Sequence, residues 1–205
     1  SEGLGAGNIP EKARHAAEES IESIDKMLSD GTKMVFITAG MGGGTGTGAA
    51  PIIAREAKSK NILTIGIVTI PFQFEGNRKI DQALDGVEAI SKNVDALLVV
   101  NNERLREIYP ELTISDAFGR ADDTLTLAAR SIAEIITTHG KINLDFNDVC
   151  TVLRDGGVAI MSTGKGEGEL RVKSAIDDAL NSPLLNNNDI FDAKKVLLYI
   201  YCSDK

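Results

Sequence analysis

The chain has 205 residues, of which 42% are hydrophobic and 25% are charged. This composition is typical of a globular protein and argues against a disordered one. The net charge of −8 argues against general affinity for nucleic acid, because phosphate backbones bind basic surfaces. No apolar run reaches the roughly 20 residues of a membrane span, and residues 1–7 lack the pattern of a signal peptide. Cys150 and Cys202 have no metal-ligand spacing, so we expect reduced thiols in a cytoplasmic protein.

The first two thirds of the chain alternate between strand and helix patterns. A helix is predicted first, with Pro10 at its first position and Gly31 after its end. Apolar runs then predict strands at 34–38, 62–68 and 96–100, and helices are predicted from near Pro51, over 76–92 and over 115–138. Such alternation predicts an α/β fold whose parallel sheet has helices on both faces, with ligands at the carboxyl ends of the strands.

The regular alternation of strand and helix patterns changes after the long predicted helix. The pattern predicts a short helix at 146–153, a strand at 158–162, a glycine-rich turn at 164–168, a helix ending at Leu180 and a strand at 196–201. We therefore place a domain boundary near Asp145 and expect a nucleotide domain at 1–144 followed by part of a second, α+β domain at 145–205.

A glycine-rich turn is predicted between the first strand and the helix near Pro51. Residues 40–48 read GMGGGTGTG and hold six glycines, which let successive backbone N–H groups approach a ligand closely. A helix amino end would add favourable polarity for phosphates. The alternative is a turn kept small for packing, which we expect to explain one or two glycines but not six.

Two common nucleotide motifs fit this turn poorly. A Walker A loop needs Lys and then Ser or Thr after its last glycine, whereas Ala49 and Ala50 follow here. A dinucleotide site needs an acid at the end of the next strand, which instead ends at Val68 and Thr69. A dinucleotide-dependent oxidoreductase is therefore the weaker interpretation.

The glycine turn resembles the signature of the tubulin/FtsZ GTPases, GGGTGTG, at residues 42–48. The resemblance extends along essentially the full chain through blocks at 3–7, 71–76 (PFQFEG), 116–118 (DAF), 143–148 (NLDFND) and 182–185 (SPLL). It implies a tubulin-like, Rossmann-type sheet with a long central helix. It also implies a GTPase that polymerises during cell division, in the cytoplasm at midcell.

The resemblance implies a set of GTP-binding residues. By this resemblance, the loop facing the terminal phosphate is Gly5, Ala6 and Gly7, and the main phosphate loop is Gly42, Gly43, Gly44, Thr45, Gly46, Thr47 and Gly48. The acid for the ribose is Glu75, with Lys79 as its basic neighbour. The pair that reads guanine is Asn102 and Asp122, and the aromatic side chain on the base is Phe118. Carboxylate chemistry agrees, since Asp122 can accept from both N1–H and the amine of guanine. Taken alone, Phe118 reads as a core residue and Asp122 as a solvated helix acid.

Asn143, Asp145 and Asp148 match the family's catalytic loop. Taken alone, two acids three residues apart at a helix start are ordinary capping residues. The predicted helix between Asp122 and Thr138 is roughly 24 Å long, so these acids and a base held by Asp122 lie at opposite ends. Acids that cannot reach their own nucleotide can serve a neighbour's, in a head-to-tail filament.

The chain departs from the family pattern in several places. Lys79 stands where Arg is common, which loses a forked contact, and Asn101 stands where Pro is frequent. The resemblance also implies an internal fragment, without the first three strands and first phosphate loop and without the last strands and partner-binding tail. We expect such a fragment to be inactive alone and to self-associate through the exposed edge of its first strand.

The resemblance further implies Mg²⁺ carried by the GTP or GDP rather than a metal site of the protein. As partners it implies other copies of the chain and division-ring proteins, with no nucleic acid and no membrane insertion. The second hypothesis is a scaffold protein that kept the fold and lost hydrolysis. Asn143, Asp145 and Asp148 favour the GTPase.

Overall fold

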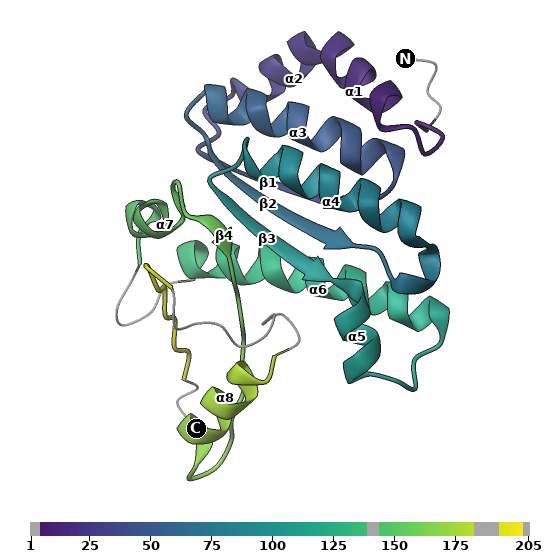
Figure 1. The fold of residues 1–205 in the computed structure, drawn as a ribbon. Helices are drawn as coiled ribbons and strands as arrows, with labels where there is room; N and C mark the ends of the chain where they lie inside the picture. Colours follow the sequence, from purple (N-terminus) through teal and green to yellow (C-terminus); the bar gives the residue numbers. More distant parts are fainter. Residues whose placement is uncertain (1–4, 139–143, 183–192, 203–205) are drawn as a thin grey trace.

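The computed structural model describes residues 5–138, 144–182 and 193–202. Its centre is a four-stranded sheet in the order β1 (Met34–Gly40), β2 (Leu63–Ile70), β3 (Ala96–Asn101) and β4 (Gly157–Ala159) (Figure 1). Every pair of neighbouring strands is parallel, as the alternating pattern predicted. β2 is buried from Leu63 to Thr69, which explains why its sequence is an unbroken apolar run.

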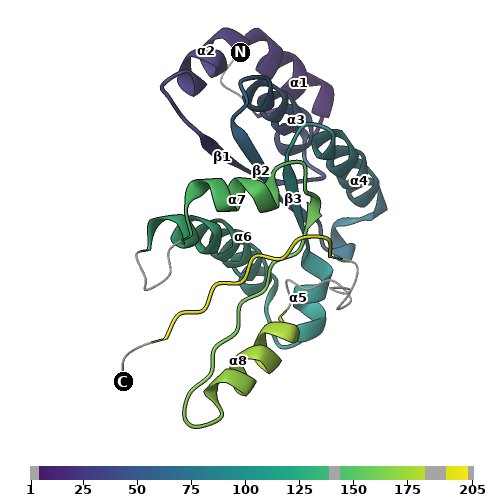
Figure 2. The ribbon, with the colours of Figure 1, turned by 90° about the vertical axis from the view of Figure 1, so that its left-hand side faces the viewer.

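Helices cover both faces of the sheet, which confirms the predicted layers (Figures 1 and 2). One layer contains α1 (Pro10–Glu19), α2 (Ile21–Leu28), α3 (Gly44–Ser59) and α4 (Asn77–Ser91). Its core joins Ile37 and Val68 of the sheet to alanines such as Ala54, which let α3 lie close to the strands. The other layer contains α6 (Ile114–Thr137) and α7 (Phe146–Leu153), and its core joins Ile65, Ala128 and Val149.

Three elements differ from their sequence predictions in the first half of the chain. The predicted helix from Pro10 breaks at Ser20 into α1 and α2. The helix expected to begin near Pro51 begins at Gly44, because glycines without side chains let its first two turns pack closely, and Pro51 lies inside it. The helix α5 (Asn102–Ile108) was not predicted; the Asn101 side chain caps it by accepting from Glu103 N.

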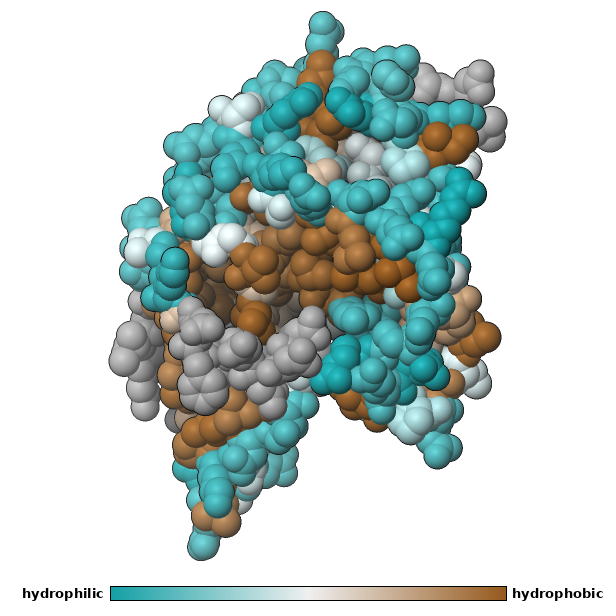
Figure 3. Space-filling model, in the orientation of Figure 1, coloured by the Kyte–Doolittle hydropathy of each residue, from teal (hydrophilic) through white to brown (hydrophobic). Residues whose placement is uncertain are grey.

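The last quarter of the chain differs more. β4 is shorter than the predicted strand at 158–162, and it extends the same sheet by pairing with β3. Residues 196–201 form no strand, since no neighbour in the described ranges pairs with them, and Val196, Leu198 and Ile200 are exposed. The helix α8 (Arg171–Leu180) also exposes apolar side chains, and Figure 3 shows this hydrophobic surface at the lower end of the molecule. The predicted boundary near Asp145 stays a prediction.

Candidate functional site

The glycine turn joins β1 to α3 at the carboxyl end of the sheet (Figure 1). Gly42 has a φ of +93°, the left-handed conformation that favours glycine. Its N–H donates to Thr47 Oγ1 at 2.9 Å, and its carbonyl accepts from Gln82 Nε2 at 2.9 Å. The buried Thr47 hydroxyl therefore holds the turn in shape, whereas Thr45 is exposed at the start of α3.

Packing explains more of these glycines than the sequence analysis expected. An added Cβ would lie 2.6 Å from Lys79 O at Gly42, 2.8 Å from Ala6 Cβ at Gly44, 2.3 Å from Gly40 O at Gly46 and 2.1 Å from Pro10 O at Gly48. Four of the six glycines are thus required by close contacts, and the expectation of one or two was wrong. Gly43 is different, because a Cβ there would meet no atom within 4 Å. Gly43 and Thr45 are therefore the residues of this turn that indicate a ligand.

The loop before α1 lies against the start of α3. Ala6 and Ile9 approach Gly44 so closely that a side chain there would collide with both. A tight turn closes the loop, with Ile9 N donating to Ala6 O at 3.1 Å and Gly7 at a φ of +59°. The structure thus brings two of the predicted phosphate segments together, Gly5–Gly7 and Gly42–Gly48.

The segment after β2 carries the predicted ribose acid. Glu75 ends a short 3₁₀ helix, η1 (Gln73–Glu75), and its carboxylate accepts from Phe72 N at 3.0 Å and from Lys79 Nζ at 2.9 Å. Its side chain is 15% exposed and that of Lys79 is 41% exposed. A carboxylate has about four acceptor positions, so Glu75 can accept further hydrogen bonds from a ligand.

Asn102 begins α5 directly after β3 and is buried. Its Oδ1 is the buried side-chain atom that lacks a hydrogen-bond partner among the described residues. Buried polar atoms are nearly always paired, and leaving one unpaired costs about 1–3 kcal/mol. An unpaired acceptor at the carboxyl end of a parallel strand indicates a ligand that donates a hydrogen bond there.

The other two predicted base contacts lie on α6. Phe118 packs edge-on against the buried Phe72 ring, with centroids 5.2 Å apart, and remains 41% exposed. Asp122 lies one turn further, in a groove of about 620 Å³ that Phe36 and Thr38 of β1 also line. Phe118 therefore has the contact with a buried ring that a core residue would have, and it also leaves part of its own ring exposed.

The predicted catalytic acids lie at the other end of the sheet. Asp145 caps α7 by accepting from Asn147 N at 2.8 Å and Asp148 N at 2.9 Å, and Asp148 Oδ2 accepts from Asp145 N at 3.0 Å. Both side chains are exposed, and each carboxylate has a second oxygen without a partner in the described part of the chain. Figure 1 shows α7 beside the amino ends of the strands, away from α5 and the glycine turn. Asn143 lies outside the described residues.

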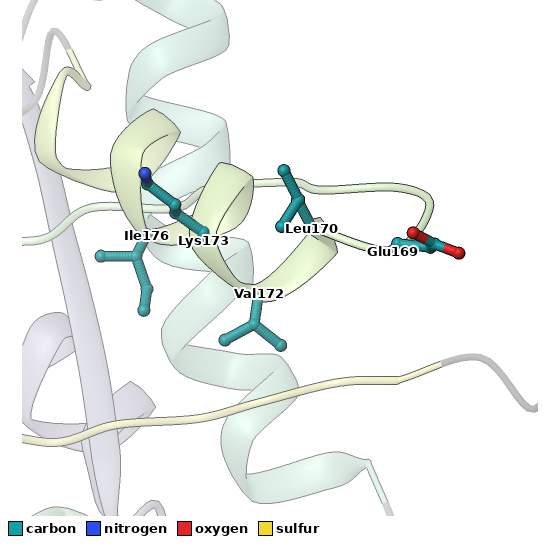
Figure 4. A pocket seen from close by; sticks show the side chains of 5 residues that line it. All are labelled: Glu169, Leu170, Val172, Lys173 and Ile176. Atoms are coloured by element: carbon teal, nitrogen blue, oxygen red, sulfur yellow. The ribbon is translucent and has the colours of Figure 1, made fainter.

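Other candidate sites carry little chemistry. A shallow hollow of about 380 Å³ on α8 is lined by Leu170, Val172, Ile176, Glu169 and Lys173, whose polar groups do not converge (Figure 4). The described residues contain no group of three His, Cys, Asp or Glu side chains placed to hold a metal. None of the helices in the described ranges is long and apolar enough to cross a membrane.

Two residues that shape the site were not predicted from the sequence. Gln82 of α4 donates to the Gly42 carbonyl, and its Nε2 lies 3.5 Å from Asn8 Oδ1, so it links the glycine turn to the loop before α1. Glu103 of α5 accepts from Gln73 N at 3.0 Å. Neither contact has a local sequence signal, because the partners are 30 or more residues apart.

Comparison with known proteins gives consistent results. The family model "Tubulin/FtsZ family, GTPase domain" matches residues 1–110, and "FtsZ family, C-terminal domain" matches residues 157–205. The cell division protein FtsZ of Porphyromonas gingivalis is 67% identical over 200 residues, which cover 97% of this chain and 44% of that protein. The mitochondrial division protein fszA of Dictyostelium discoideum is 50% identical over 202 residues, or 98% of this chain and 39% of that protein.

A solved structure described as an empty FtsZ dimer from M. jannaschii superposes with a TM-score of 0.84 at 45% identity. It covers 89% of this chain and 53% of that one, so the chain spans about half the length of the relatives it matches. The GTPase-domain model alone matches residues 1–110 of 205, and the C-terminal model matches a further segment. The chain therefore belongs to the tubulin/FtsZ family.

Proposed function

We propose that this chain is part of a GTP-dependent polymerising GTPase that forms the cell-division ring. The observation that carries the proposal is the unpaired, buried Oδ1 of Asn102 at the carboxyl end of β3. Guanine offers N–H donors that can satisfy an amide oxygen and a nearby carboxylate together, whereas adenine does not offer the same pair. Asn102 and Asp122 would read the base in this way, with the exposed part of the Phe118 ring against it.

The phosphates would lie at the start of α3. Gly43 leaves room for close approach to the backbone, and the exposed Thr45 can donate its hydroxyl to a phosphate oxygen. The amino end of a helix of 16 residues adds favourable polarity for negative charge. Gly5–Gly7 would face the terminal phosphate from the adjoining loop, and Glu75 with Lys79 would hold the ribose. We expect Mg²⁺ to arrive with the nucleotide.

Hydrolysis would require two subunits. Asp145 and Asp148 lie at the amino ends of the strands, whereas Asn102 and Gly43 lie at the carboxyl ends, so one chain cannot bring both sets to one nucleotide. Head-to-tail stacking would place the exposed carboxylates of one subunit over the terminal phosphate of the next. There they would orient and polarise the attacking water, with Asn143 beside them, and positioning of this kind dominates phosphoryl transfer.

The wider cellular role is part of the proposal. The relatives are named as division proteins, and we expect this protein to act at midcell in the cytoplasm. Its partners would be other copies of itself and division-ring proteins. A scaffold that kept the fold but lost hydrolysis is the competing function, and intact Asp145 and Asp148 favour the GTPase.

Calorimetric titration of the full-length protein with GTP and with ATP tests the assignment. GTP should bind more tightly than ATP. Asp122→Ala should weaken GTP binding by about 1–3 kcal/mol, because a donor on the base is left unpaired. Equal affinity for the two nucleotides would contradict the proposal.

A further inference from the structure

Two segments of the proposed base and ribose site leave neighbouring strands at the same edge of the sheet. Ile70 of β2 is paired in register with Asn101 of β3, so the chain continues from adjacent positions into η1 and α5. η1 carries Glu75, and α5 begins with Asn102. Their relative placement decides whether ribose and base can be held together.

Glu103 joins the two segments. Its Oε2 accepts from Gln73 N at 3.0 Å, which is the one hydrogen bond between η1 and α5 in the described part of the chain. Its other oxygen accepts from Arg106 Nε at 2.7 Å. The Glu103 side chain is 17% exposed, and Asn101 fixes its backbone by accepting from Glu103 N. Gln73 and Arg106 therefore hold the carboxylate while Asn101 holds the backbone of the same residue, so Glu103 is not a freely moving surface acid.

The far side of η1 is fixed in a similar way. Glu75 accepts from Phe72 N, and the Phe72 ring is fully buried beneath Phe118. Gln73 and Glu75 lie in the same short turn, η1. A shift of Gln73 would therefore also move the Glu75 carboxylate. The Arg106 guanidinium and the Gln73 N–H also hold the pKa of Glu103 below its ordinary value, as expected for a carboxylate used in its charged form.

We propose that Glu103 is a positioning residue for nucleotide binding, one that sets the ribose acid Glu75 against the base-reading Asn102. This proposal rests on the proposed GTP function. It concerns a residue that would not touch the nucleotide itself, and its effect is transmitted through the hydrogen bond to Gln73 N.

The test measures the affinity of the full-length protein for GTP and for 2′,3′-dideoxy-GTP, which lacks the ribose hydroxyls. Glu103→Ala should weaken GTP about tenfold, because a hydrogen bond to a charged group is lost, and should bring the two affinities close together. Glu103→Gln keeps an acceptor for Gln73 N and should recover most of the loss. Glu107→Ala is the matched control, since Glu107 forms an exposed i,i+3 pair with Arg104 on the same helix at 2.7 Å.

The double variant with Glu75→Gln separates positioning from general destabilisation. If Glu103 acts through Glu75, Glu103→Ala should add little once the Glu75 carboxylate is gone. Equal effects of Glu103→Ala and Glu107→Ala would overturn the inference, and so would equal weakening of GTP and its dideoxy analogue. A wild-type protein that bound neither nucleotide would instead refute the proposed function.

Discussion

The carboxyl and amino ends of the sheet present polar groups in different ways. At the carboxyl end, the loop before α1, the glycine turn, η1 and α5 meet, and Asn102 keeps a buried acceptor unpaired. At the amino end, Asp145 and Asp148 lie on one helix, are exposed and cap that helix themselves. The first arrangement is suited to holding a ligand. The second offers two carboxylates to something outside the chain, so binding and hydrolysis should respond to different mutations.

The largest effect is expected at the amino end. Asp145→Asn and Asp148→Asn should each lower GTP hydrolysis by about 100-fold or more, since they remove the charge that polarises water. GTP affinity should stay unchanged. Asparagine caps helices as well as aspartate does, so the α7 cap is kept and the loss reports on charge alone. Single-turnover hydrolysis and calorimetry of the full-length protein give the two quantities.

Mixing provides the control for that result. Asp148→Asn subunits added to wild type should lower GTP turnover by more than dilution of the wild-type subunits alone would, because each variant subunit prevents hydrolysis of the nucleotide bound to a neighbour. Loss of GTP binding by the variant subunit itself would show that the acids serve their own site.

The glycine turn should separate packing from binding. Gly48→Ser places a Cβ against Pro10 O and should lower the free energy of unfolding by about 1–3 kcal/mol. Gly43→Ser meets no neighbour and supplies a good helix cap, so stability should change by less than about 0.5 kcal/mol. GTP binding should nevertheless weaken, since the added atoms occupy the phosphate approach. Urea unfolding and GTP titration measure the stability and the GTP affinity of the two variants. Unchanged GTP binding by Gly43→Ser would indicate that the main role of the turn is packing.

Asn102 tests the carboxyl end with a neighbouring control. Asn102→Ala should weaken GTP by about 1–3 kcal/mol and reduce the preference for GTP over ATP. The Asn101 side chain caps α5 by accepting from Glu103 N. Asn101→Ser keeps a capping side chain there, so this variant should bind GTP like wild type. If the two variants bind alike, the unpaired Oδ1 of Asn102 does not meet the base.

The smallest effect concerns pH. Because Arg106 and the Gln73 N–H lower the pKa of Glu103 in the folded protein, its carboxylate stabilises the fold above the ordinary glutamate pKa of about 4.3. That contribution is lost as pH falls below this value toward the folded pKa. Nearby charges are Arg106 itself, which stays protonated throughout, and Glu107, which faces Arg106 and pairs with Arg104.

Glu103→Gln should therefore flatten the acid side of the stability curve. Urea midpoints measured between pH 3 and 6 would show the difference, with Glu107→Gln as the comparison. Parallel curves for Glu103→Gln and wild type would mean that the negative charge of Glu103 adds no stability to the fold.

Local patterns predicted most of the fold and the elements that carry the site. Continuous apolar runs predicted β1, β2 and β3, and the helical pattern near 146–153 predicted α7. Helix α3 was placed seven residues late because Pro51 resembles a first helical residue, whereas contacts with Pro10 and Ala6 allow the helix to begin at Gly44. Such contacts between distant segments have no local signal. The same limit hid Gln82 and Glu103.

The central claim is that GTP is hydrolysed only where two subunits meet. The most direct measurement is GTP turnover per subunit of the full-length protein as its concentration rises, with filament formation followed by light scattering in the same samples. Turnover per subunit should be low where the protein is monomeric and should rise to a plateau together with scattering. Constant turnover per subunit across that range, including the monomeric samples, would contradict the shared site.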